Sequence, residues 1–534
     1  MSSPGYPINP RLLPNRLPRV SVTLTARNAA ELAEKAEQVA RDNSFLEFRL
    51  DYLSQPPSFF PKLKSFIEFH PHLVLIATCR RAKSGGKFRG SVASEIDVLA
   101  KAAALGCHLV DIELDTAKVM KAKDWAKLRR NNAAIIISTH DFRGTKDLEK
   151  IFARMAAQPA DFLKIVTTAR ELYDNVIMMK FLASRKDPRP IVGLCMGEQG
   201  IISRVLGVRA GSAFTFGAAF PGEETAPGQI AARTLRETFR IEQVDVATRV
   251  YGVAGDPVGH SLSPAMMNTA FRRENLNAVY LGLHAKTMGD LMKCVREIPI
   301  HGLSITMPYK EAIIKYLDGT DTMTDKVGAC NTVIRSQDGK LYGFNTDVAG
   351  VVRPIELRMN VTGAKILVLG AGGAARAAAF GLKERGAEVY IMNRTAAKAQ
   401  KLAKQAKARF LNRSGLSKLL AKGYSFDVVI NATPVGMDGD NGRHRMEPPI
   451  ISEKEMVTRY VFEMVYSPQE TRFTRMARNK GVHVIPGSEM FVQQGARQFE
   501  IWTGKPAPVE EMHRVVLHAL EQRASLAAAA KKGK

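Results

Sequence analysis

Short apolar runs rich in β-branched residues alternate with helix-like stretches over about the first 240 residues of the chain. Alternation of strand and helix predicts parallel strands. Eight such units within this length match the size of a (β/α)8 barrel. The predicted strands are Arg19–Ala26, Phe45–Leu53, Leu73–Arg80, Leu109–Asp115, Ala133–Asp141, Phe162–Ala169, Pro190–Met196 and Gly211–Gly217.

Three charged residues alternate at the end of the second predicted strand, E-F-R-L-D. Side chains alternate between the two faces of a strand, so Glu47, Arg49 and Asp51 are expected to share one face. Chemistry in such barrels occurs at the carboxyl ends of the strands. Charges that face a barrel interior are either paired in an internal ion network or functional, and both interpretations stay open here.

A single lysine, Lys164, interrupts the apolar sixth strand F-L-K-I-V. Burying a charged amine is costly, so either the side chain extends to the rim or it is a desolvated amine suited to imine chemistry. The arginines Arg49, Arg80 and Arg204 are expected to surround it and to favour the neutral, nucleophilic amine.

Six motifs in order, E-F-R-L-D, T-x-R-x-A-K-x-G-G, S-T-H-D-F, K-I-V, I-S-R…G-S…T-F and A-P-G-Q-I, make residues 18–243 resemble type I 3-dehydroquinate dehydratase. The resemblance implies that Lys164 forms an imine with the substrate ketone. It implies that His140 is the general acid/base and that Glu47 supports His140. The substrate-binding residues that it implies are Arg49, Arg80, Arg204, Thr225 and Gln229.

Two positions depart from that family's pattern. Ser84 stands where its members commonly have an acid, and Thr225 stands where a serine is usual. The first departure predicts a weaker hold on substrate or a shifted pH optimum. An alternative for the barrel is a class I aldolase-like activity, which shares the imine-forming lysine.

A second glycine-rich pattern begins at Lys365, beyond a polar junction at Ile241–Thr248. The sequence A-K-I-L-V-L-G-A-G-G-A-A-R is typical of a strand, a tight turn and a helix that together bind a dinucleotide. Gly370, Gly372 and Ala375 fill the positions of G-x-G-x-x-G/A, with the pyrophosphate expected at the helix N-terminus.

The second strand of this lobe favours NADP over NAD. It ends in Asn393-Arg394-Thr395 and is followed by Lys398, where an NAD-binding fold would offer an acid to the ribose. Two cations suit a 2′-phosphate, although Arg394 as a solvated helix-start residue remains the alternative. The predicted cofactor-binding residues are Gly370, Ala371, Gly372, Gly373, Ala374, Asn393, Arg394, Thr395, Lys398 and Thr433.

The motifs H-S-L-S-P, S-I-T-M-P-Y-K, G-A-C-N-T, F-N-T-D, N-A-T-P-V-G-M and E-M-F-V-Q-Q-G-A make residues 249–522 resemble shikimate dehydrogenase. The resemblance implies a catalytic pair, Lys310 and Asp347. Hydride transfer to a ketone leaves an alkoxide that needs a proton, which a lysine beside a carboxylate can donate. The substrate-binding residues that it implies are Ser261, Ser263, Thr306, Asn331, Tyr466 and Gln494.

The predicted organisation is an α/β chain in which a TIM barrel (18–243) precedes a two-lobe dehydrogenase. The dehydrogenase comprises a substrate-binding lobe (249–352), a Rossmann-like NADP lobe (353–488) and C-terminal helices (489–525) that return to the substrate lobe. This order resembles the bifunctional dehydratase–dehydrogenase of plants and some bacteria, which implies two consecutive steps from 3-dehydroquinate through 3-dehydroshikimate to shikimate.

Two alternatives concern the second half. It could prefer quinate, or the chain could be a non-catalytic quinate-sensing, repressor-like protein. Ser261 and Ser263 are both present, which favours shikimate. Retention of Lys164, His140, Lys310 and Asp347 favours an enzyme.

The composition of the chain bears on its partners, its compartment and its relation to membranes. Lys and Arg are spread along the chain despite a net charge of +25, which argues against nucleic acid as a partner. The five cysteines are scattered, which suits a reducing compartment without a metal site. The sequence contains no run of 18 or more apolar residues, so it predicts no membrane-spanning helix. The acid-free N-terminus is short for a transit peptide, so we expect a cytoplasmic protein, plastidial only if that segment is a transit remnant.

Overall fold

The computed structural model describes residues 13, 17–259, 261–437, 444 and 446–532 of the 534-residue chain. The N-terminal segment considered as a transit remnant and His260 of the H-S-L-S-P motif therefore lie largely or wholly outside the described residues. Contacts divide the chain into two compact units. Unit 1 comprises Met1–Arg249 and Asn277–Pro299, and unit 2 comprises Val250–Leu276 and Ile300–Lys534. Among the described helices, none is both long and apolar enough to cross a membrane.

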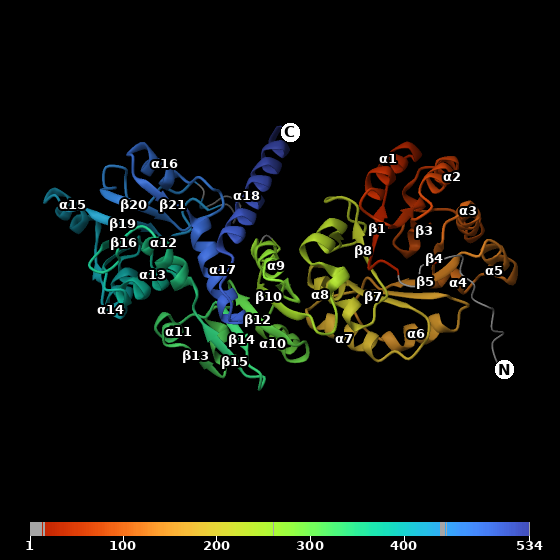
Figure 1. The fold of residues 1–534 in the computed structure, drawn as a ribbon, viewed down its shortest axis with the longest axis horizontal. Helices are drawn as coiled ribbons and strands as arrows, with labels where there is room; N and C mark the ends of the chain where they lie inside the picture. Colours follow the sequence, from red (N-terminus) through yellow and green to blue (C-terminus); the bar gives the residue numbers. More distant parts are fainter. Residues whose placement is uncertain (1–12, 14–16, 260, 438–443, 445, 533–534) are drawn as a thin grey trace. The chain divides into compact units, whose positions relative to one another are not determined.

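Unit 1 contains the predicted barrel (Figure 1). Its strands pair in parallel in the order β7-β6-β5-β4-β3-β2-β1-β8-β9. Ser212, just before β8, bridges to Ile191 of β7, so the two ends of the sheet meet. The strands are β1 (Val20–Leu24), β2 (Phe45–Arg49), β3 (Val74–Thr78), β4 (Leu109–Glu113), β5 (Ala134–His140), β6 (Phe162–Thr168), β7 (Ile191–Met196), β8 (Thr215–Ala218) and β9 (Ile230–Ala231).

Helices follow the barrel strands as the alternating pattern predicts. Asn28 begins the first of them by accepting hydrogen bonds from two backbone N–H groups, those of Ala30 and Glu31, as a helix N-cap does. The helices are α1 (Ala29–Ala40), α2 (Phe60–Phe69), α3 (Val92–Leu105), α4 (Leu114–Ala117), α5 (Ala122–Arg129), α6 (Leu148–Ala156), α7 (Tyr173–Ala183) and α8 (Ile201–Leu206).

The alternation on β2 is confirmed for Glu47 and Arg49, whereas Asp51 lies in the helical turn that follows the strand and does not line the cavity. Phe48 packs against Phe59 and Phe66 on the helical side, with ring centroids 5.3 and 5.8 Å away. Glu47 and Arg49, one position to either side, are buried and face a cavity inside the barrel. A strand with period two thus divides the apolar outer layer from the polar interior.

Unit 1 also includes β11 (Ala278–His284) and α10 (Met288–Glu297). The buried carboxylate of Asp290 on α10 accepts hydrogen bonds from the backbone N–H groups of Leu172 and Tyr173, at 2.7 and 3.0 Å. These N–H groups lie at the start of α7, where a helix has donors without internal partners and favours negative charge.

The first sheet of unit 2 is mixed. Strands β10, β12, β14, β15 and β13 are neighbours in that order; β10 and β12 are parallel, whereas β14 is antiparallel to both β12 and β15. The elements of this region are β10 (Arg249–Gly255), α9 (Ser263–Arg273), β12 (Ile300–Ile305), β13 (Gly319–Thr320), α11 (Thr322–Val327), β14 (Thr332–Arg335) and β15 (Leu341–Phe344).

The second sheet of unit 2 has the parallel order β18-β17-β16-β19-β20-β21, which is the doubly wound order of a Rossmann-like lobe. Its elements are α12 (Asp347–Glu356), β16 (Lys365–Leu369), α13 (Gly373–Glu384), β17 (Glu388–Met392), α14 (Ala396–Ala406), β18 (Arg409–Phe410), α15 (Arg413–Ala421), β19 (Phe426–Asn431), β20 (Thr458–Glu463), α16 (Arg472–Asn479) and β21 (His483–Ile485).

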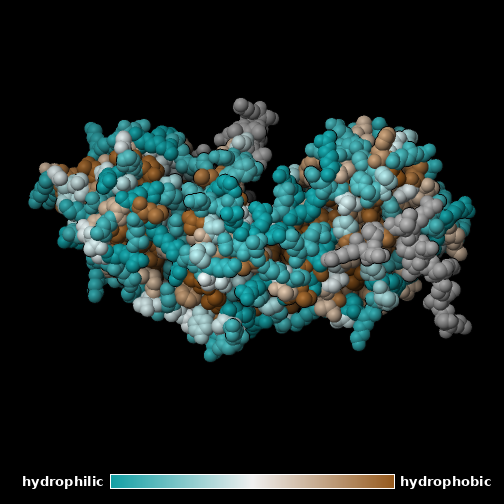
Figure 2. Space-filling model, viewed as in Figure 1, coloured by the Kyte–Doolittle hydropathy of each residue, from teal (hydrophilic) through white to brown (hydrophobic). Residues whose placement is uncertain are grey.

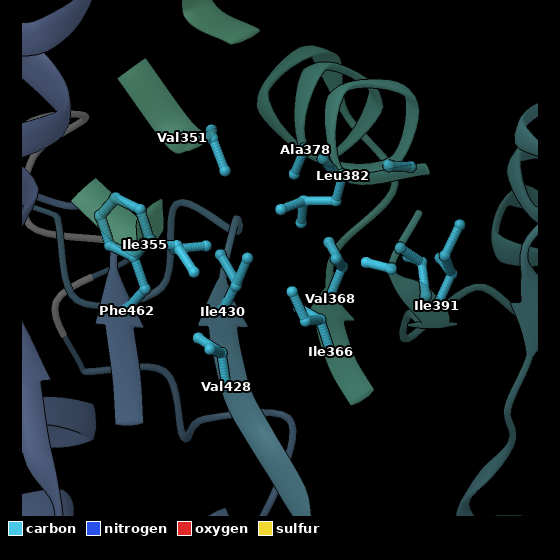
Figure 3. Packing of buried hydrophobic residues seen from close by; sticks show 14 of the residues in the cluster. Val351, Ile355, Ile366, Val368, Ala378, Leu382, Ile391, Val428, Ile430 and Phe462 are labelled. Carbon is cyan, nitrogen blue, oxygen red and sulfur yellow. The ribbon is translucent and has the colours of Figure 1, made fainter. Parts of the chain in front are cut away.

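Helices α12 and α13 cover one face of this parallel sheet (Figure 3). Small residues such as Ala375, Ala378 and Ala379 let α13 approach the sheet closely, and all three are buried. The residues that meet in this core include Val351, Ile355, Leu382, Ile366, Val368, Ile391, Val428, Ile430 and Phe462.

Two final helices, α17 (Gly487–Thr503) and α18 (Val509–Lys532), complete unit 2. Helix α17 returns to the first sheet of the unit, as the sequence predicts. Trp502 donates from its indole nitrogen to the Val333 carbonyl at 3.0 Å, and Gln498 donates to the Asn331 carbonyl at 3.1 Å.

The face drawn in Figure 2 is mainly hydrophilic, with apolar residues in separate small patches.

Candidate active sites

The first candidate site is a cavity at the carboxyl ends of the barrel strands in unit 1. All eight barrel residues predicted from the sequence line it: Glu47, Arg49, Arg80, His140, Lys164, Arg204, Thr225 and Gln229. Ser84 and Phe142 also line it. The structure therefore brings together side chains from β2, β5 and β6, from the segment after β3, from α8 and from the loop before β9.

Lys164 is buried, with only 4% of its surface exposed, and does not reach the rim. Its amine lies 2.8 Å from a carboxylate oxygen of Asp111 and 4.0 Å from one of Glu47, above the ring of Phe216. The three arginines that were expected around it line the same cavity, but the nearest charged group to the amine is the carboxylate of Asp111, which the sequence argument did not include. Burial alone would raise the pKa of Asp111, but the charges of Lys164 and Arg80 hold that pKa well below its usual range.

Two of the three arginines that were expected around Lys164 have carboxylate partners of their own. Arg49 forms two hydrogen bonds with Asp51, both of 2.9 Å. Arg80 lies 2.8 Å from Asp111 and 3.4 Å from Glu113. The Arg49–Asp51 pair is bidentate and the Arg80–Asp111 pair is buried, so both guanidinium groups are held in fixed positions.

His140 contacts a carboxylate other than the one predicted. Its Nδ1 lies 3.0 Å from Oε2 of Glu113, and its backbone N–H donates to Oε1 of the same residue at 3.0 Å. Glu47 instead accepts hydrogen bonds from Thr23 and Thr78, at 2.9 and 2.7 Å. The prediction that Glu47 supports His140 is thus wrong in its geometry, because Glu47 lies on the lysine side of the cavity.

Sequence reasoning missed Asp111 and Glu113, the two carboxylates of β4. The signal was present, because D-I-E alternates as E-F-R does on β2 and both carboxylates are therefore expected on one face. Both are buried, and the hydroxyl of Ser138 donates to Asp111 at 2.6 Å and lies 3.1 Å from Glu113.

Arg204 is the cation in this cavity for which the described residues provide no carboxylate. Its Nε is buried without a hydrogen-bond partner, and one terminal nitrogen donates to the Pro227 carbonyl at 3.3 Å. Burial lowers the pKa of Arg204 to about 10. An uncompensated buried guanidinium is suited to a carboxylate ligand, which would supply the missing charge. Gln229 accepts from the Thr225 hydroxyl at 3.0 Å beside it.

The second candidate site is a cavity of about 400 Å³ in unit 2. All eight residues that the sequence predicts for catalysis or substrate binding line it: Ser261, Ser263, Thr306, Lys310, Asn331, Asp347, Tyr466 and Gln494. The cavity also contains Ala374 of α13 and Met464, so it opens against the Rossmann-like lobe of the same unit.

A short polar chain crosses this cavity. The amine of Lys310 donates to Asp347 Oδ2 at 2.5 Å, and Asn331 donates to Asp347 Oδ1 at 2.8 Å. Both carboxylate oxygens are therefore occupied, which fixes the position of the lysine amine. Such a lysine can polarise a bound carbonyl and transfer a proton to it.

Sequence reasoning missed two buried polar residues near this cavity. Gln498 accepts from the Ser304 hydroxyl at 2.7 Å. Glu463 accepts from Asn431 and from the Thr471 hydroxyl, at 2.9 and 2.7 Å, and burial raises its pKa to about 7. The sequence offers no signal for either, because each lies in an otherwise apolar or helical run.

The glycine turn after β16 fits a dinucleotide. A Cβ on Gly370, whose φ is +126°, would lie 2.8 Å from the Ala432 carbonyl oxygen, so the turn requires glycine there. A Cβ on Gly372 or Gly373 would meet nothing within 4 Å, which leaves space for a pyrophosphate at the start of α13.

A neighbouring cavity of about 540 Å³ contains three of the predicted cofactor residues: Asn393, Arg394 and Thr433. Ala374 lines the substrate cavity instead. The other predicted cofactor residues, Gly370, Ala371, Gly372, Gly373, Thr395 and Lys398, line neither cavity. Arg394 lies 3.5 Å from the carboxylate of Glu447, an acid that the sequence argument about the 2′-phosphate did not include.

Family models match the chain along most of its length. Residues 20–246 match type I 3-dehydroquinase, and residues 253–333 match the shikimate dehydrogenase substrate binding domain. Residues 355–436 match shikimate/quinate 5-dehydrogenase, and residues 487–517 match the shikimate 5′-dehydrogenase C-terminal domain.

Individual proteins are also similar in sequence to this chain. A bifunctional 3-dehydroquinate dehydratase/shikimate dehydrogenase of Arabidopsis thaliana, described as chloroplastic, is 35% identical over 497 residues, covering 89% of this chain and 80% of that protein. An NADP⁺ shikimate dehydrogenase of Methanosarcina acetivorans is 39% identical over 51% of this chain and 99% of its own length. A solved shikimate 5-dehydrogenase of Thermus thermophilus is 34% identical, with a TM-score of 0.46, over 51% of this chain and 100% of that chain. The chain belongs to the family of bifunctional 3-dehydroquinate dehydratase/shikimate dehydrogenases.

Proposed function

We propose that unit 1 dehydrates 3-dehydroquinate to 3-dehydroshikimate and that unit 2 reduces 3-dehydroshikimate to shikimate with NADPH. The observation that carries this proposal is a pair of cavities, each with a lysine amine held by a carboxylate: Lys164 by Asp111, and Lys310 by Asp347. The two lysines serve different chemistry because one is buried for covalent catalysis and the other faces a cofactor lobe.

In the barrel, the Lys164 amine attacks the substrate ketone, and loss of one water gives an imine. His140 then removes the proton from the carbon next to the imine, and returns a proton to the departing hydroxyl so that it leaves as water. Hydrolysis of the imine releases the product and restores the amine. Arg204, which has no carboxylate partner among the described residues, receives the substrate carboxylate.

In unit 2, Ser261 and Ser263 bind the substrate carboxylate, and hydroxyl contacts come from Thr306, Asn331, Tyr466 and Gln494. NADPH supplies the hydride when it is bound at the glycine turn. Lys310 donates the proton that the developing alkoxide needs, and Asp347 holds the amine in place.

The direct test is a coupled assay with the full chain. Addition of 3-dehydroquinate and NADPH should oxidise NADPH only if both units work in sequence. If NADPH is not oxidised, separate assays of the two half-reactions show which unit fails. A comparison of shikimate with quinate as the alcohol tests the substrate of unit 2, and faster oxidation of quinate would overturn its assignment. We place these reactions in the cytoplasm and take small anionic molecules as the partners.

Replacing Arg204 by glutamine should raise the KM for 3-dehydroquinate by about 10- to 100-fold. This factor corresponds to the free energy that one charge-assisted hydrogen bond contributes to binding. The same variant should unfold at a higher temperature, because a buried cation without a counter-charge is destabilising. Steady-state kinetics and thermal unfolding measure the two effects. An unchanged KM would place the substrate carboxylate elsewhere.

Replacing Arg394 by glutamine should raise the KM for NADPH by about 10-fold and leave that for NADH nearly unchanged, because only NADPH carries the 2′-phosphate. Glu447→Gln is the matched control: it removes the acid 3.5 Å from Arg394 and should not weaken NADPH binding. Equal losses with both cofactors in Arg394→Gln would contradict the assignment.

A further inference from the structure

We propose that Arg376 is a positioning residue of the reductase, because it fixes the short segment 328–331 that contacts both members of the catalytic pair. The proposal rests on the proposed function of unit 2. Arg376 lies in the first turn of α13, yet its side chain binds the end of another helix, α11.

The guanidinium group of Arg376 donates to three acceptors, and two of them are carbonyls of the last residues of α11. Nε donates to the Val327 carbonyl at 2.6 Å, and Nη2 donates to the Lys326 carbonyl at 3.3 Å. Nη1 donates to the side chain of Gln405 on α14 at 2.8 Å. The last carbonyls of a helix have no partner within it and favour a positive charge. Arg376 therefore caps α11 from a different helix.

This cap explains a cation at the start of α13. The backbone N–H of Arg376 donates to the Gly372 carbonyl at 2.9 Å, so its side chain begins one turn from the helix N-terminus. A helix N-terminus favours negative charge, and here it is the expected place of the pyrophosphate. Because each nitrogen of the guanidinium has a protein acceptor, the side chain is committed to α11 and α14 and not to a phosphate.

The segment that follows α11 leads directly into the active site. Helix α11 ends at Val327, and four residues later the Asn331 side chain donates to Asp347 at 2.8 Å. Between them, the backbone N–H of Cys330 donates to the Lys310 carbonyl at 2.8 Å. One short segment thus holds Asp347 through a side chain and Lys310 through its backbone.

Helix α13 is also packed against the helix that carries Asp347. Asp347 is the first residue of α12, and a Cβ on Gly381 of α13 would lie 2.6 Å from Cγ1 of Val348. The packing of α12 therefore fixes Asp347 independently, whereas the backbone of Lys310 depends on the segment that Arg376 holds. Loss of Arg376 should displace the lysine relative to its partner, and a displacement of about 1 Å can lower a rate by about 100-fold.

The test is a double-variant cycle in the full chain that combines Arg376→Gln with Lys310→Ala. Arg376→Gln alone should lower kcat for 3-dehydroshikimate reduction by about 10- to 100-fold and change the KM for NADPH by less than about threefold. In the Lys310→Ala background the same replacement should lower kcat by less than about threefold, because the amine that Arg376 positions is gone. Each kcat is expressed per NADPH-binding site, so that a loss of folded protein does not enter the comparison.

Two further variants complete the design. Arg376→Lys keeps a cation at the end of α11 and should recover part of the lost rate. Arg385→Gln is the matched control, because Arg385 lies at the other end of α13 and pairs with Glu356 at 3.0 Å, away from α11. It should leave kcat and both KM values unchanged.

An equal loss of kcat in the two backgrounds, or a wild-type kcat in Arg376→Gln, would overturn the proposal. A large rise in the KM for NADPH would also contradict it, since Arg376 would then be a ligand of the pyrophosphate. The proposed function of unit 2 fails in a different way, through a wild-type chain that does not reduce 3-dehydroshikimate with NADPH at all.

Discussion

Replacing Lys164 by alanine is expected to reduce dehydration of 3-dehydroquinate by at least about 10⁴-fold, because the covalent intermediate can no longer form. The reduction of 3-dehydroshikimate in unit 2 should continue at its normal rate, since Lys310 and its partners are untouched. Separate assays of the two half-reactions on the same preparation measure both effects.

The control for this variant is Lys164→Arg. Alanine leaves the buried Asp111 with Arg80 as its remaining cation, and loss of one partner of a buried pair destabilises a protein by about 3–5 kcal/mol. Arginine keeps the positive charge beside Asp111 but cannot form an imine with a ketone. Trapping with borohydride in the presence of 3-dehydroquinate should label the wild type and neither variant. An active Lys164→Arg protein would show that the charge, and not the amine, is what the reaction uses.

The second large effect is expected at Lys310. Its replacement by alanine should lower kcat for 3-dehydroshikimate reduction by about 10²–10⁴-fold, the usual contribution of a general acid. KM should change little, because other side chains hold the substrate carboxylate and hydroxyls. Dehydration by unit 1 should be unaffected.

Lys315→Ala serves as its control. Lys315 lies above the ring of Tyr316 and does not line the cavity, so its loss removes one nearby positive charge without changing the catalytic pair. Equal loss in both variants would attribute the effect to local charge. Asp347→Asn should resemble Lys310→Ala in kcat, since the amine would lose the acceptor 2.5 Å away.

Much of this architecture can be predicted from the sequence because the period of the apolar residues matches the elements. Seven of the eight predicted barrel strands contain an observed strand, and the eighth, predicted at Gly211–Gly217, overlaps the observed Thr215–Ala218. The glycine turn at Gly370 was equally clear, since its backbone conformation excludes a side chain. The boundaries between the domains stay predictions.

The residues that line the cavities were predicted better than the pairs of charged groups that these residues form. Period two places Glu47, Arg49 and Lys164 inside the barrel, but which carboxylate meets which cation depends on the register between neighbouring strands. Ser138 pairs with Lys164 on one side and with Glu113 on the other, and this register brings β4 into the site. No pattern within a single strand gives that register, so the carboxylate beside His140 was taken to be Glu47, although the D-I-E alternation already places Glu113 on the inner face.

The return of α17 to the first sheet of unit 2 has a consequence for how the protein becomes active during its synthesis. Every residue that lines the barrel cavity lies between Thr23 and Gln229, whereas Gln494 and Gln498 of α17 belong to the other cavity. Chains emerge from the ribosome N-terminus first, at about 5–20 residues per second. A nascent chain therefore holds a full set of dehydratase side chains long before the wall of its reductase pocket has been translated.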